Sequence, residues 1–314
     1  MTSIAPTSWP RLGLGCAALG QPDVREHDAV ATIARAFERG IRFFDVAPLY
    51  GGGLGEERLG RALRGVPRGD YVLCSKTGVT RPHAQPATPP GATRARAADR
   101  WDYSAAATRA SVMRSLERLG SDHLDVVHLH DVDDHLDVCL DAHAELTRLR
   151  DEGMVGAIGI GSNATAPVAA LLARARFDSF LLAGCYTLLD QRGATLIEDS
   201  ARAGIAVIAG GIYNSGILSR WPPVAPTYAY QPAKPAIVER TARIAAACTQ
   251  HGTTLPAAAL QFVMTNPAIT TVLLGPRSVD ELEQNLAASA SPLPPRLLET
   301  LEREGLLVSA GVAA

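Results

Sequence analysis

The sequence predicts a single (β/α)8 barrel domain that spans residues 1–314. Short apolar runs alternate with longer stretches whose apolar residues recur at helical spacing, which indicates strands that alternate with helices. The short runs are apolar throughout, as expected for parallel strands that are covered on both faces. Eight such units in a chain of 314 residues fit a closed barrel better than an open doubly wound sheet.

Each predicted strand is a short, mostly apolar run that precedes a helical stretch. The strands are expected at residues 11–19, 41–46 (IRFFDV), 71–75 (YVLCS), 124–130, 155–161 (VGAIGIG), 179–183, 205–209 (IAVIA) and 270–274 (TTVLL). The helices are expected at residues 28–39, 56–64, 104–119, 138–152, 166–174, 192–203, 236–250, 256–265 and 279–288. Gly40, Gly153 and Gly204 come directly after predicted helices, where a left-handed residue commonly ends the helix.

The composition is that of a folded chain without a strong charge of either sign. The 30 basic and 32 acidic side chains give a net charge of -2, so the chain lacks the basic surplus that nucleic-acid binding needs. Hydrophobic residues make up 47% and charged residues 20%, which excludes an intrinsically disordered chain. Because aromatic residues are only 5%, the barrel interior is expected to consist mainly of small aliphatic side chains.

The five cysteines indicate a reducing compartment. They are odd in number, widely scattered and without a C-x-x-C pair: Cys16, Cys74, Cys139, Cys185 and Cys248. The N-terminus lacks a secretory signal pattern, and no run of about 18 apolar residues is available to span a bilayer. We therefore expect a cytoplasmic protein without a membrane partner.

Two segments interrupt the alternation of strands and helices. Residues 77–100 are rich in Pro and Arg, and residues 210–235 carry aromatic residues among prolines. Both follow a strand, so both are expected without regular structure at the C-terminal mouth of the barrel, where long loops often cover a pocket. The aromatic residues expected to shape a substrate pocket there are Trp101, Tyr103, Tyr213 and Trp221.

Ionisable side chains stand at the ends of three successive strands. Asp45 ends the second strand, with Tyr50 five residues further on. Lys76 ends the third strand and His130 the fourth. Adjacent strands lie about 4.8 Å apart and barrel chemistry is found at strand ends, so these four groups can converge.

The four groups suit proton transfer at a carbonyl or hydroxyl oxygen. An ammonium group beside Tyr50 favours the phenolate and lowers the tyrosine pKa, and Asp45 would keep Lys76 charged and oriented. His130 can hydrogen-bond a substrate oxygen. The set offers no nucleophile with an attached base, so acyl transfer is not expected.

With these residues in place, the sequence resembles the aldo-keto reductases along nearly its whole length. FFDVAPLYG at 43–51, CSKTG at 74–78 and LDVVHLHD at 124–131 resemble the segments that carry the family's catalytic tetrad. The tetrad that the resemblance implies is Asp45, Tyr50, Lys76 and His130, with Tyr50 and His130 also facing the substrate.

The resemblance also implies a nicotinamide cofactor, NAD or NADP, across the barrel mouth. GIGSN at 159–163 resembles the segment that binds the carboxamide, IAGGIYNSGIL at 208–218 the one that covers the pyrophosphate, and LLGPRSVDELEQN at 273–285 the one that grips the adenosine end. The implied contacts are Gly15, Cys16, Asp45, Ser162, Asn163, Gly210, Gly211, Ile212, Gly216, Gly275, Arg277, Ser278, Gln284 and Asn285. Two interpretations of Arg277 stay open: it pairs with the 2′-phosphate of NADP, or it stacks on adenine while Asp280 or Glu283 disfavours that phosphate.

Three positions depart from the usual family pattern. Ala183 stands where a glutamine beside the nicotinamide is usual, Gly210 where a stacking tyrosine is frequent, and Cys16 where a threonine often follows the first-strand glycines. Together with APLYG and with CYTLLDQ at 185–191, these departures resemble the sugar-dehydrogenase branch, the L-fucose, D-threo-aldose and L-galactose dehydrogenases, with pyridoxal 4-dehydrogenase nearby. That branch oxidises an aldose at C1 to the lactone.

A metal site is the main competing interpretation of the fourth strand. His128 and His130 are two residues apart and share a strand face, as metal-binding histidines of barrel hydrolases do. No histidine stands at the end of the fifth or sixth strand, so we expect no metal. His128 is then a core histidine or a support for His130.

The sequence thus predicts an NAD(P)-dependent oxidoreductase, first of all an aldose 1-dehydrogenase, that acts on a small sugar or aldehyde as a monomer or small homo-oligomer. The alternative is a general aldehyde or ketone reductase that uses NADPH. A metal-dependent barrel hydrolase and a non-catalytic cofactor-sensing subunit are more distant alternatives, because the implied tetrad is complete.

Overall fold

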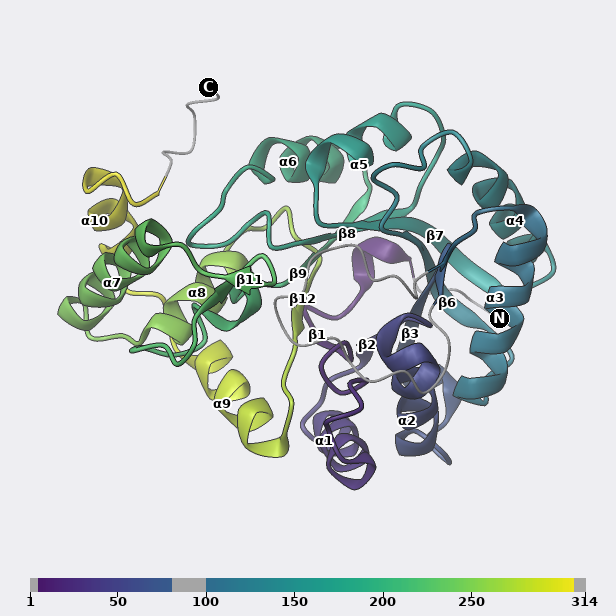
Figure 1. Cartoon of the computed structure of the whole chain (residues 1–314), viewed down its shortest axis with the longest axis horizontal. Coiled ribbons are helices and arrows are strands. Elements are labelled where there is room, and N and C mark those ends of the chain that lie inside the picture. The colour runs from purple at the N-terminus through teal and green to yellow at the C-terminus, as the bar shows by residue number, and fades with distance from the viewer. Residues whose placement is uncertain (1–4, 81–99, 308–314) are drawn as a thin grey trace.

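Eight parallel strands close into a barrel in a computed structural model that describes residues 5–80 and 100–307 (Figure 1). Around the barrel the order is β1-β12-β9-β8-β7-β6-β3-β2. These strands are β1 (Leu12–Gly15), β2 (Phe43–Asp45), β3 (Val72–Thr77), β6 (Leu124–His130), β7 (Val155–Ser162), β8 (Ser179–Ala183), β9 (Ala206–Gly210) and β12 (Thr271–Leu274). The predicted fold class is confirmed.

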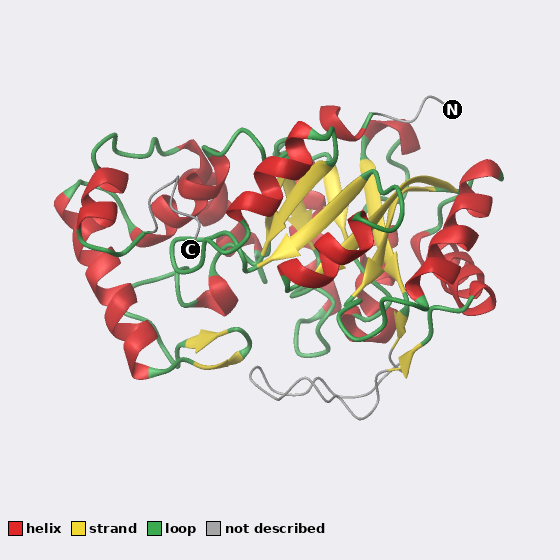
Figure 2. Ribbon diagram, turned by 90° about the horizontal axis from the view of Figure 1, so that it is seen from above, coloured by secondary structure: helices red, strands yellow, loops and turns green. Residues whose placement is uncertain are grey.

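Helices cover the outside of the barrel (Figures 1 and 2). They are α1 (Glu26–Glu38), α2 (Leu54–Ala62), α3 (Ala105–Leu119), α4 (Cys139–Asp151), α5 (Thr165–Leu172), α6 (Ala194–Arg202), α7 (Pro235–Gln250), α8 (Leu255–Met264), α9 (Val279–Ala290) and α10 (Leu297–Arg303). Among the α-helices of the described residues, the prediction missed α10, a short helix that buries Leu297 and Leu301, four residues apart on one face.

The first strand is shorter than predicted, because the chain turns after Gly15. The Cys16 amide donates to the Asp45 carbonyl (2.8 Å) and the Gly20 amide to the Cys16 carbonyl (2.9 Å). A Cβ atom on Gly20 would lie 2.9 Å from the Cβ of Tyr50. The turn therefore brings residues 16–20 against the Tyr50 segment, where only glycine fits at position 20.

The barrel interior holds larger side chains than the composition suggested. Trp9 and Phe43 pack together at the N-terminal end with ring centroids 5.4 Å apart, and both are buried. The remaining apolar side chains of this inner cluster are Val72, Cys74, Val126, Ala157, Leu181, Ala206, Ile208 and Leu273. The interior thus combines the expected small aliphatic side chains with the rings of Trp9 and Phe43 at the N-terminal end of the barrel.

The two interrupting segments contain short sheets that were not predicted. β4 (Val79–Thr80) pairs antiparallel with β5 (Arg100–Trp101), and the intervening chain, residues 81–99, lies outside the described residues. β10 (Thr227–Tyr228) pairs antiparallel with β11 (Gln231–Pro232). Figure 2 shows both small sheets on the same side of the barrel.

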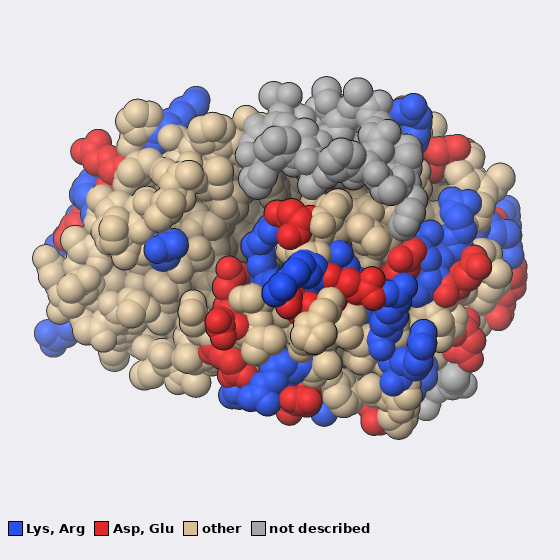
Figure 3. All heavy atoms as spheres, turned by 60° about the horizontal axis from the view of Figure 1, so that its bottom comes forward, with Lys and Arg blue, Asp and Glu red and all other residues tan. Residues whose placement is uncertain are grey.

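Charges of both signs mix on the molecular surface. Figure 3 shows Lys and Arg side chains interleaved with Asp and Glu over the centre and right of one face, whereas its left side carries few charges. On this face the two signs of charge are therefore mixed rather than gathered into separate patches. Across the described helices, none combines the length and apolarity needed to cross a bilayer.

Candidate active site

The barrel mouth brings the four tetrad residues together. Asp45 ends β2, Lys76 is the penultimate residue of β3, and His130 ends β6, so these three residues come from neighbouring strands. Tyr50 begins the short 3-10 helix η2 (Tyr50–Gly53), which follows β2. The exposed fractions of Asp45, Lys76 and His130 are 2%, 2% and 7%, so the site is largely screened from water.

Lys76 and Asp45 form a buried ion pair. The ammonium nitrogen lies 2.7 and 2.8 Å from the two carboxylate oxygens and also donates to the Val46 carbonyl at 2.9 Å. Burial alone would lower the pKa of Lys76, but the Asp45 carboxylate and the Tyr50 phenol outweigh it, so the pKa is raised. Lys76 therefore stays charged and fixed.

Tyr50 is held by a run of left-handed glycines. Gly51, Gly52 and Gly53 have φ of 66°, 67° and 107°, and a Cβ atom on Gly51 would lie 1.9 Å from the Gly20 carbonyl oxygen. The Tyr50 ring centroid is 4.9 Å from the Lys76 nitrogen. It is 5.9 Å from the His130 ring, which meets it edge-on at 89°.

The pKa of Tyr50 moves in the direction opposite to the sequence-based expectation. Burial raises it, and this effect exceeds the lowering by Lys76. The charge effect that the sequence predicted is present, but desolvation is larger. Without ligands the phenol is therefore neutral and can donate a proton.

The backbone of His130 is held in place by a hydrogen bond from the Tyr103 side chain. The Tyr103 hydroxyl donates to the backbone carbonyls of His130 and Asp131, the latter at 3.1 Å. Its ring packs on Gly78, where a Cβ atom would lie 2.1 Å from a ring carbon. Tyr103 is only 2% exposed and supports the β6 end, and its expected place in a substrate pocket stays a prediction.

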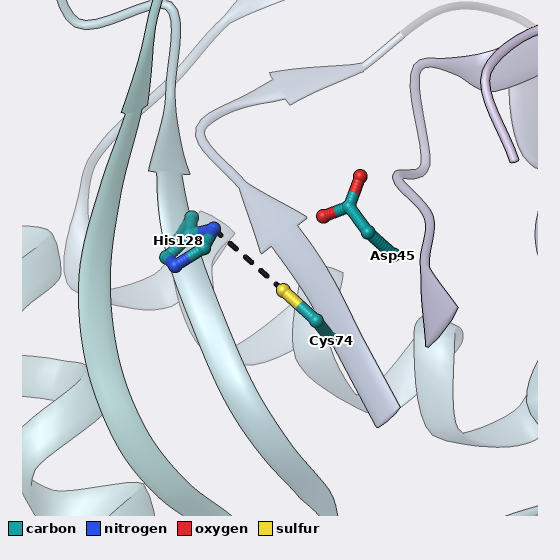
Figure 4. Close-up of side chains that lie close together, drawn as sticks. All are labelled: Asp45, Cys74 and His128. Atoms are coloured by element: carbon teal, nitrogen blue, oxygen red, sulfur yellow. Dashed lines mark hydrogen bonds between the residues drawn. The ribbon is translucent and has the colours of Figure 1, made fainter. Parts of the chain in front are cut away.

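His128 is fully buried and points toward Cys74, with Asp45 nearby (Figure 4). Its Nδ1 is 3.6 Å from the Cys74 sulfur and its Nε2 is 3.1 Å from the Ser179 hydroxyl. Burial, then the charge of Lys76, lowers the pKa of His128 well below its ordinary value, so the imidazole is neutral. This is the core role that the sequence left open.

The donor atoms of Asp45, Cys74 and His128 lie within 4.8 Å of one another, the spacing of a metal site. Both Asp45 oxygens, however, already accept from Lys76, and burial raises the pKa of the Cys74 thiol well above its ordinary value. A neutral thiol and an occupied carboxylate are poor metal ligands. We interpret this group as a hydrogen-bonded part of the core.

The residues assigned to the nicotinamide end sit at the mouth. Ser162 ends β7, donates to Asp133 (3.2 Å) and accepts from the Ala164 amide (3.0 Å). Asn163, half-buried, accepts at its backbone carbonyl from the Cys185 thiol (3.1 Å). Gly15 pairs in register with Asp45, which places the end of β1 beside the tetrad.

Two departures from the family pattern lie side by side. Ala183 and Gly210 are register partners at the ends of β8 and β9. A Cβ atom on Gly210 would lie 3.3 Å from Leu181 and 3.6 Å from Ala183. The third departure, Cys16, is fully buried, so its thiol packs inward. The ends of β8 and β9 are therefore closely packed at these two small residues, and even a Cβ atom at position 210 would press on Leu181.

The segment after β9 leaves a buried polar atom without a partner. Gly211 and Gly216 adopt φ of 59° and 104°, and Ile212 is buried. The Tyr213 hydroxyl is buried and has no hydrogen-bond partner among the described residues. Trp221, 39% exposed, lies further along this segment. The pocket roles expected of Tyr213 and Trp221 stay predictions.

The segment assigned to the adenosine end leads into the N-terminus of α9. Ser278 caps this helix by accepting from the Glu281 amide (3.2 Å), and a Cβ atom on Gly275 would meet nothing within 4 Å. Gln284 and Asn285 lie on the same helix. Exposed backbone amides at a helix N-terminus suit an anionic ligand.

Arg277 has two acidic partners that the sequence did not reveal. Its guanidinium lies 2.8 Å from an Asp23 oxygen, and its amide donates to Glu281 at 2.8 Å. Glu283, one of the two acids considered from the sequence, pairs instead with Arg35 of α1 at 2.8 Å. Asp23 and Arg277 are 254 positions apart, so no sequence spacing could have indicated the pair.

A barrel with Asp, Lys, Tyr and His grouped at its mouth defines an oxidoreductase that acts on CH–OH or carbonyl groups. The chain belongs to the aldo/keto reductase family, whose model matches residues 11–303. It is therefore an enzyme of a family that uses nicotinamide cofactors.

Two relatives and one solved structure show which members of the family this chain is similar to. D-threo-aldose 1-dehydrogenase from Pseudomonas sp is 35% identical over 312 residues, covering 95% of this chain and 94% of the relative. L-galactose dehydrogenase from Arabidopsis thaliana is 32% identical over 286 residues, covering 88% and 83%. The holo form of aldo-keto reductase AKR11C1 from Bacillus halodurans superposes with a TM-score of 0.75 at 26% identity, covering 93% and 91%. The predicted resemblance to the sugar-dehydrogenase branch is thereby confirmed.

Proposed function

We propose that this enzyme is an NAD-dependent aldose 1-dehydrogenase that oxidises the C1 hydroxyl of a sugar to the lactone. The observation that carries the proposal is the Asp45–Lys76 pair, whose nitrogen lies 4.9 Å from the Tyr50 ring at a screened barrel mouth. The sugar as substrate is supported by the similarity to D-threo-aldose 1-dehydrogenase over 95% of this chain.

In this mechanism the bound cofactor supplies the hydride acceptor. His130 orients the substrate oxygen, and Tyr50 takes the C1 hydroxyl proton while the C1 hydrogen leaves as hydride and the C1–O bond becomes a carbonyl. The charge of Lys76, fixed by Asp45, stabilises the Tyr50 phenolate that this step requires. In the reverse direction the neutral Tyr50 donates its proton to the carbonyl oxygen.

The described residues fit a nicotinamide dinucleotide. Ser162 and Asn163 would hold the carboxamide, next to the register partners Ala183 and Gly210. The residues proposed to follow the cofactor from the β1 end to its adenosine end are Gly15, Cys16, Gly211, Ile212, Gly216, Gly275, Arg277, Ser278, Gln284 and Asn285. The α9 N-terminus offers amide donors for an anionic group.

We propose NAD rather than NADP from the surroundings of Arg277. Its guanidinium is paired with Asp23, and Glu281 accepts from its amide, both at 2.8 Å. A 2′-phosphate bound there would face two carboxylates and would have to displace Asp23 from the guanidinium. Like charges at this distance disfavour the second anion.

The substrate is proposed to lie between Tyr50, His130 and the aromatic rim. Trp101 is 40% exposed and stacks on His135, with ring centroids 6.1 Å apart and planes at 26°. Trp221 and the unpartnered Tyr213 hydroxyl come from the segment after β9. An aromatic face and a free hydroxyl suit the apolar face and the hydroxyl groups of a sugar ring.

A reducing compartment such as the cytoplasm is proposed as the location. All five cysteines are buried and unpaired, as expected where thiols stay reduced.

A two-by-two comparison of substrates and cofactors tests the proposal. Turnover is measured with L-fucose or D-threo-aldoses and with an aromatic aldehyde, each with NAD(H) and NADP(H). We expect the highest kcat/KM for an aldose with NAD. A higher value for the aromatic aldehyde with NADPH would replace the proposal with a general reductase. Cofactor binding without turnover of any substrate would indicate a sensing subunit.

A further inference from the structure

A cavity of about 300 Å³ lies behind the segment that carries Tyr50. Pro48 and Gly52 of that segment form one wall. Thr80 and Arg100, which face each other across the β4–β5 sheet, form another. We propose that this cavity binds a small dianion of the phosphate class.

The third wall is one face of α3. Ser111, Arg114 and Arg118 recur there at spacings of three and four residues, so their side chains project from the same side of the helix. Together with Arg100, this wall gives the cavity three guanidinium groups. Among the described residues that line it, none is acidic.

Arg118 has a carboxylate partner beside the cavity. Arg118 donates through Nε to the fully buried carboxylate of Glu56 at 2.7 Å. Arg114, by contrast, forms no ion pair within residues 5–80 and 100–307. Arg114 therefore brings to the cavity a guanidinium charge that no carboxylate of the described residues offsets, and guanidinium forks match the geometry of phosphate oxygens.

A buried hydroxyl adds an independent indication of a ligand. Ser111 is 3% exposed, and its Oγ has no hydrogen-bond partner among the described side chains and backbone. Buried polar atoms are almost always hydrogen-bonded, so an orphan in a cavity wall indicates a missing partner. A phosphate oxygen is an acceptor for this hydroxyl.

The cavity contacts the catalytic framework without using tetrad side chains. Glu56, which holds Arg118, also accepts from the Ser75 hydroxyl at 2.7 Å, and Ser75 precedes Lys76 on β3. A Cβ atom on Gly53 would lie 2.9 Å from Arg118. None of the residues that line the cavity belongs to the tetrad or to the proposed sugar and cofactor contacts. A negative result for phosphate binding would therefore leave the proposed function intact.

The test measures binding to the full-length protein by calorimetry, with sodium phosphate against sodium chloride at matched ionic strength. A parallel titration with a hexose phosphate distinguishes free phosphate from a phosphorylated sugar as the source. We expect saturable binding, and a loss of about tenfold or more in affinity for Arg114→Gln, because a charged hydrogen-bond donor is removed. Arg114 is exposed and without an ion pair in the described chain, so this variant should fold normally.

Arg296→Gln is the matched control. Arg296 is exposed and precedes α10, which Figure 1 places on the opposite side of the molecule from α3. It loses the same charge and should bind phosphate like the wild type. Ser111→Ala should weaken phosphate binding but leave the melting temperature without phosphate unchanged or higher, because its hydroxyl is unpaired. No saturable binding, or equal weakening in Arg114→Gln and Arg296→Gln, would overturn the proposal.

Discussion

At the scale of single residues, Tyr50 is governed by two opposing effects. Burial raises its pKa, and the neighbouring ammonium of Lys76 lowers it by a smaller amount. The phenolate that accepts a proton is therefore a minor species at neutral pH.

This balance predicts a pH dependence of sugar oxidation. Below its pKa the phenolate fraction grows about tenfold per pH unit, so kcat/KM for oxidation should rise with pH across the range where the protein is folded. Reduction needs the neutral phenol and should stay nearly constant over the same range. The measurement is kcat/KM in both directions between pH 6 and pH 9, roughly the folding range of most proteins. Oxidation that declines with rising pH would contradict the assignment of Tyr50 as the base.

Tyr103→Phe tests whether the Tyr103 hydroxyl positions His130. The change leaves two carbonyls of the β6 end without this donor. We expect kcat to fall severalfold with little change in the cofactor dissociation constant, and a stability loss of about 1–3 kcal/mol. Tyr71→Phe, which alters a tyrosine just before β3 at the other end of the barrel, is the control and should keep its kcat. Equal kcat in the wild type and Tyr103→Phe would exclude the positioning role.

At the scale of elements, the proposed preference for NAD over NADP depends on the turn from β12 into α9. Asp23→Asn combined with Glu281→Gln removes both carboxylates near Arg277, so the ratio of NADP to NAD affinity should rise, by about two- to tenfold. The modest size is expected because the Arg277–Asp23 pair is exposed, with side-chain fractions of 42% and 66%. Fluorescence titration of the reduced cofactors measures both affinities.

Glu283→Gln provides the comparison for that variant. Glu283 lies on the same helix but pairs with Arg35 and Arg39 of α1, so its loss should leave the ratio unchanged. If Glu283→Gln shifts the ratio as much as the double variant does, general surface charge rather than the Arg277 environment sets the preference.

The strands and helices also show how much of the fold can be predicted from the sequence. Periodicity indicated every barrel strand and nine helices, because each carries its own apolar pattern. The end of β1 was missed, since the turn at Cys16 depends on contact with the Tyr50 segment rather than on local residues. The short β4–β5 and β10–β11 sheets have too few residues to show an alternation.

The candidate site was predictable where it follows from position alone. Strand ends at one barrel mouth must converge, which placed Asp45, Lys76 and His130 correctly. What the sequence did not show needed three-dimensional neighbours: the Tyr103 ring packs on Gly78, and the Arg277–Asp23 pair joins distant parts of the chain. The direction of the Tyr50 pKa depended on burial, which no spacing reports.

At the scale of the whole molecule, the buried His128 links stability to pH. Its pKa is lowered well below the ordinary value of about 6.5 in the folded state, so below that pH the unfolded chain binds a proton that the folded chain does not. The free energy of unfolding should therefore decrease as the pH falls below about 6.5, by up to about 1.4 kcal/mol per pH unit from this group. Above that pH the contribution is fully present.

Denaturant unfolding between pH 4 and pH 7 measures this slope, a range chosen to bracket the ordinary histidine pKa of about 6.5. His128→Gln should flatten the acid side of the profile, whatever its stability at neutral pH. His27→Gln, whose side chain is 93% exposed, should keep the wild-type slope. A profile for His128→Gln that is parallel to the wild type throughout would show that His128 does not cause the acid sensitivity.

In the proposed reaction, Tyr50 transfers the proton during hydride transfer. The most direct measurement is single-turnover formation of reduced cofactor from an aldose and NAD, compared between the wild type and Tyr50→Phe, with NAD dissociation constants determined in parallel. We predict that Tyr50→Phe loses at least about a hundredfold in rate, the usual contribution of general acid–base catalysis, while its NAD affinity stays within about twofold. A wild-type rate of reduced-cofactor formation in Tyr50→Phe would contradict the proposed role of Tyr50 in proton transfer.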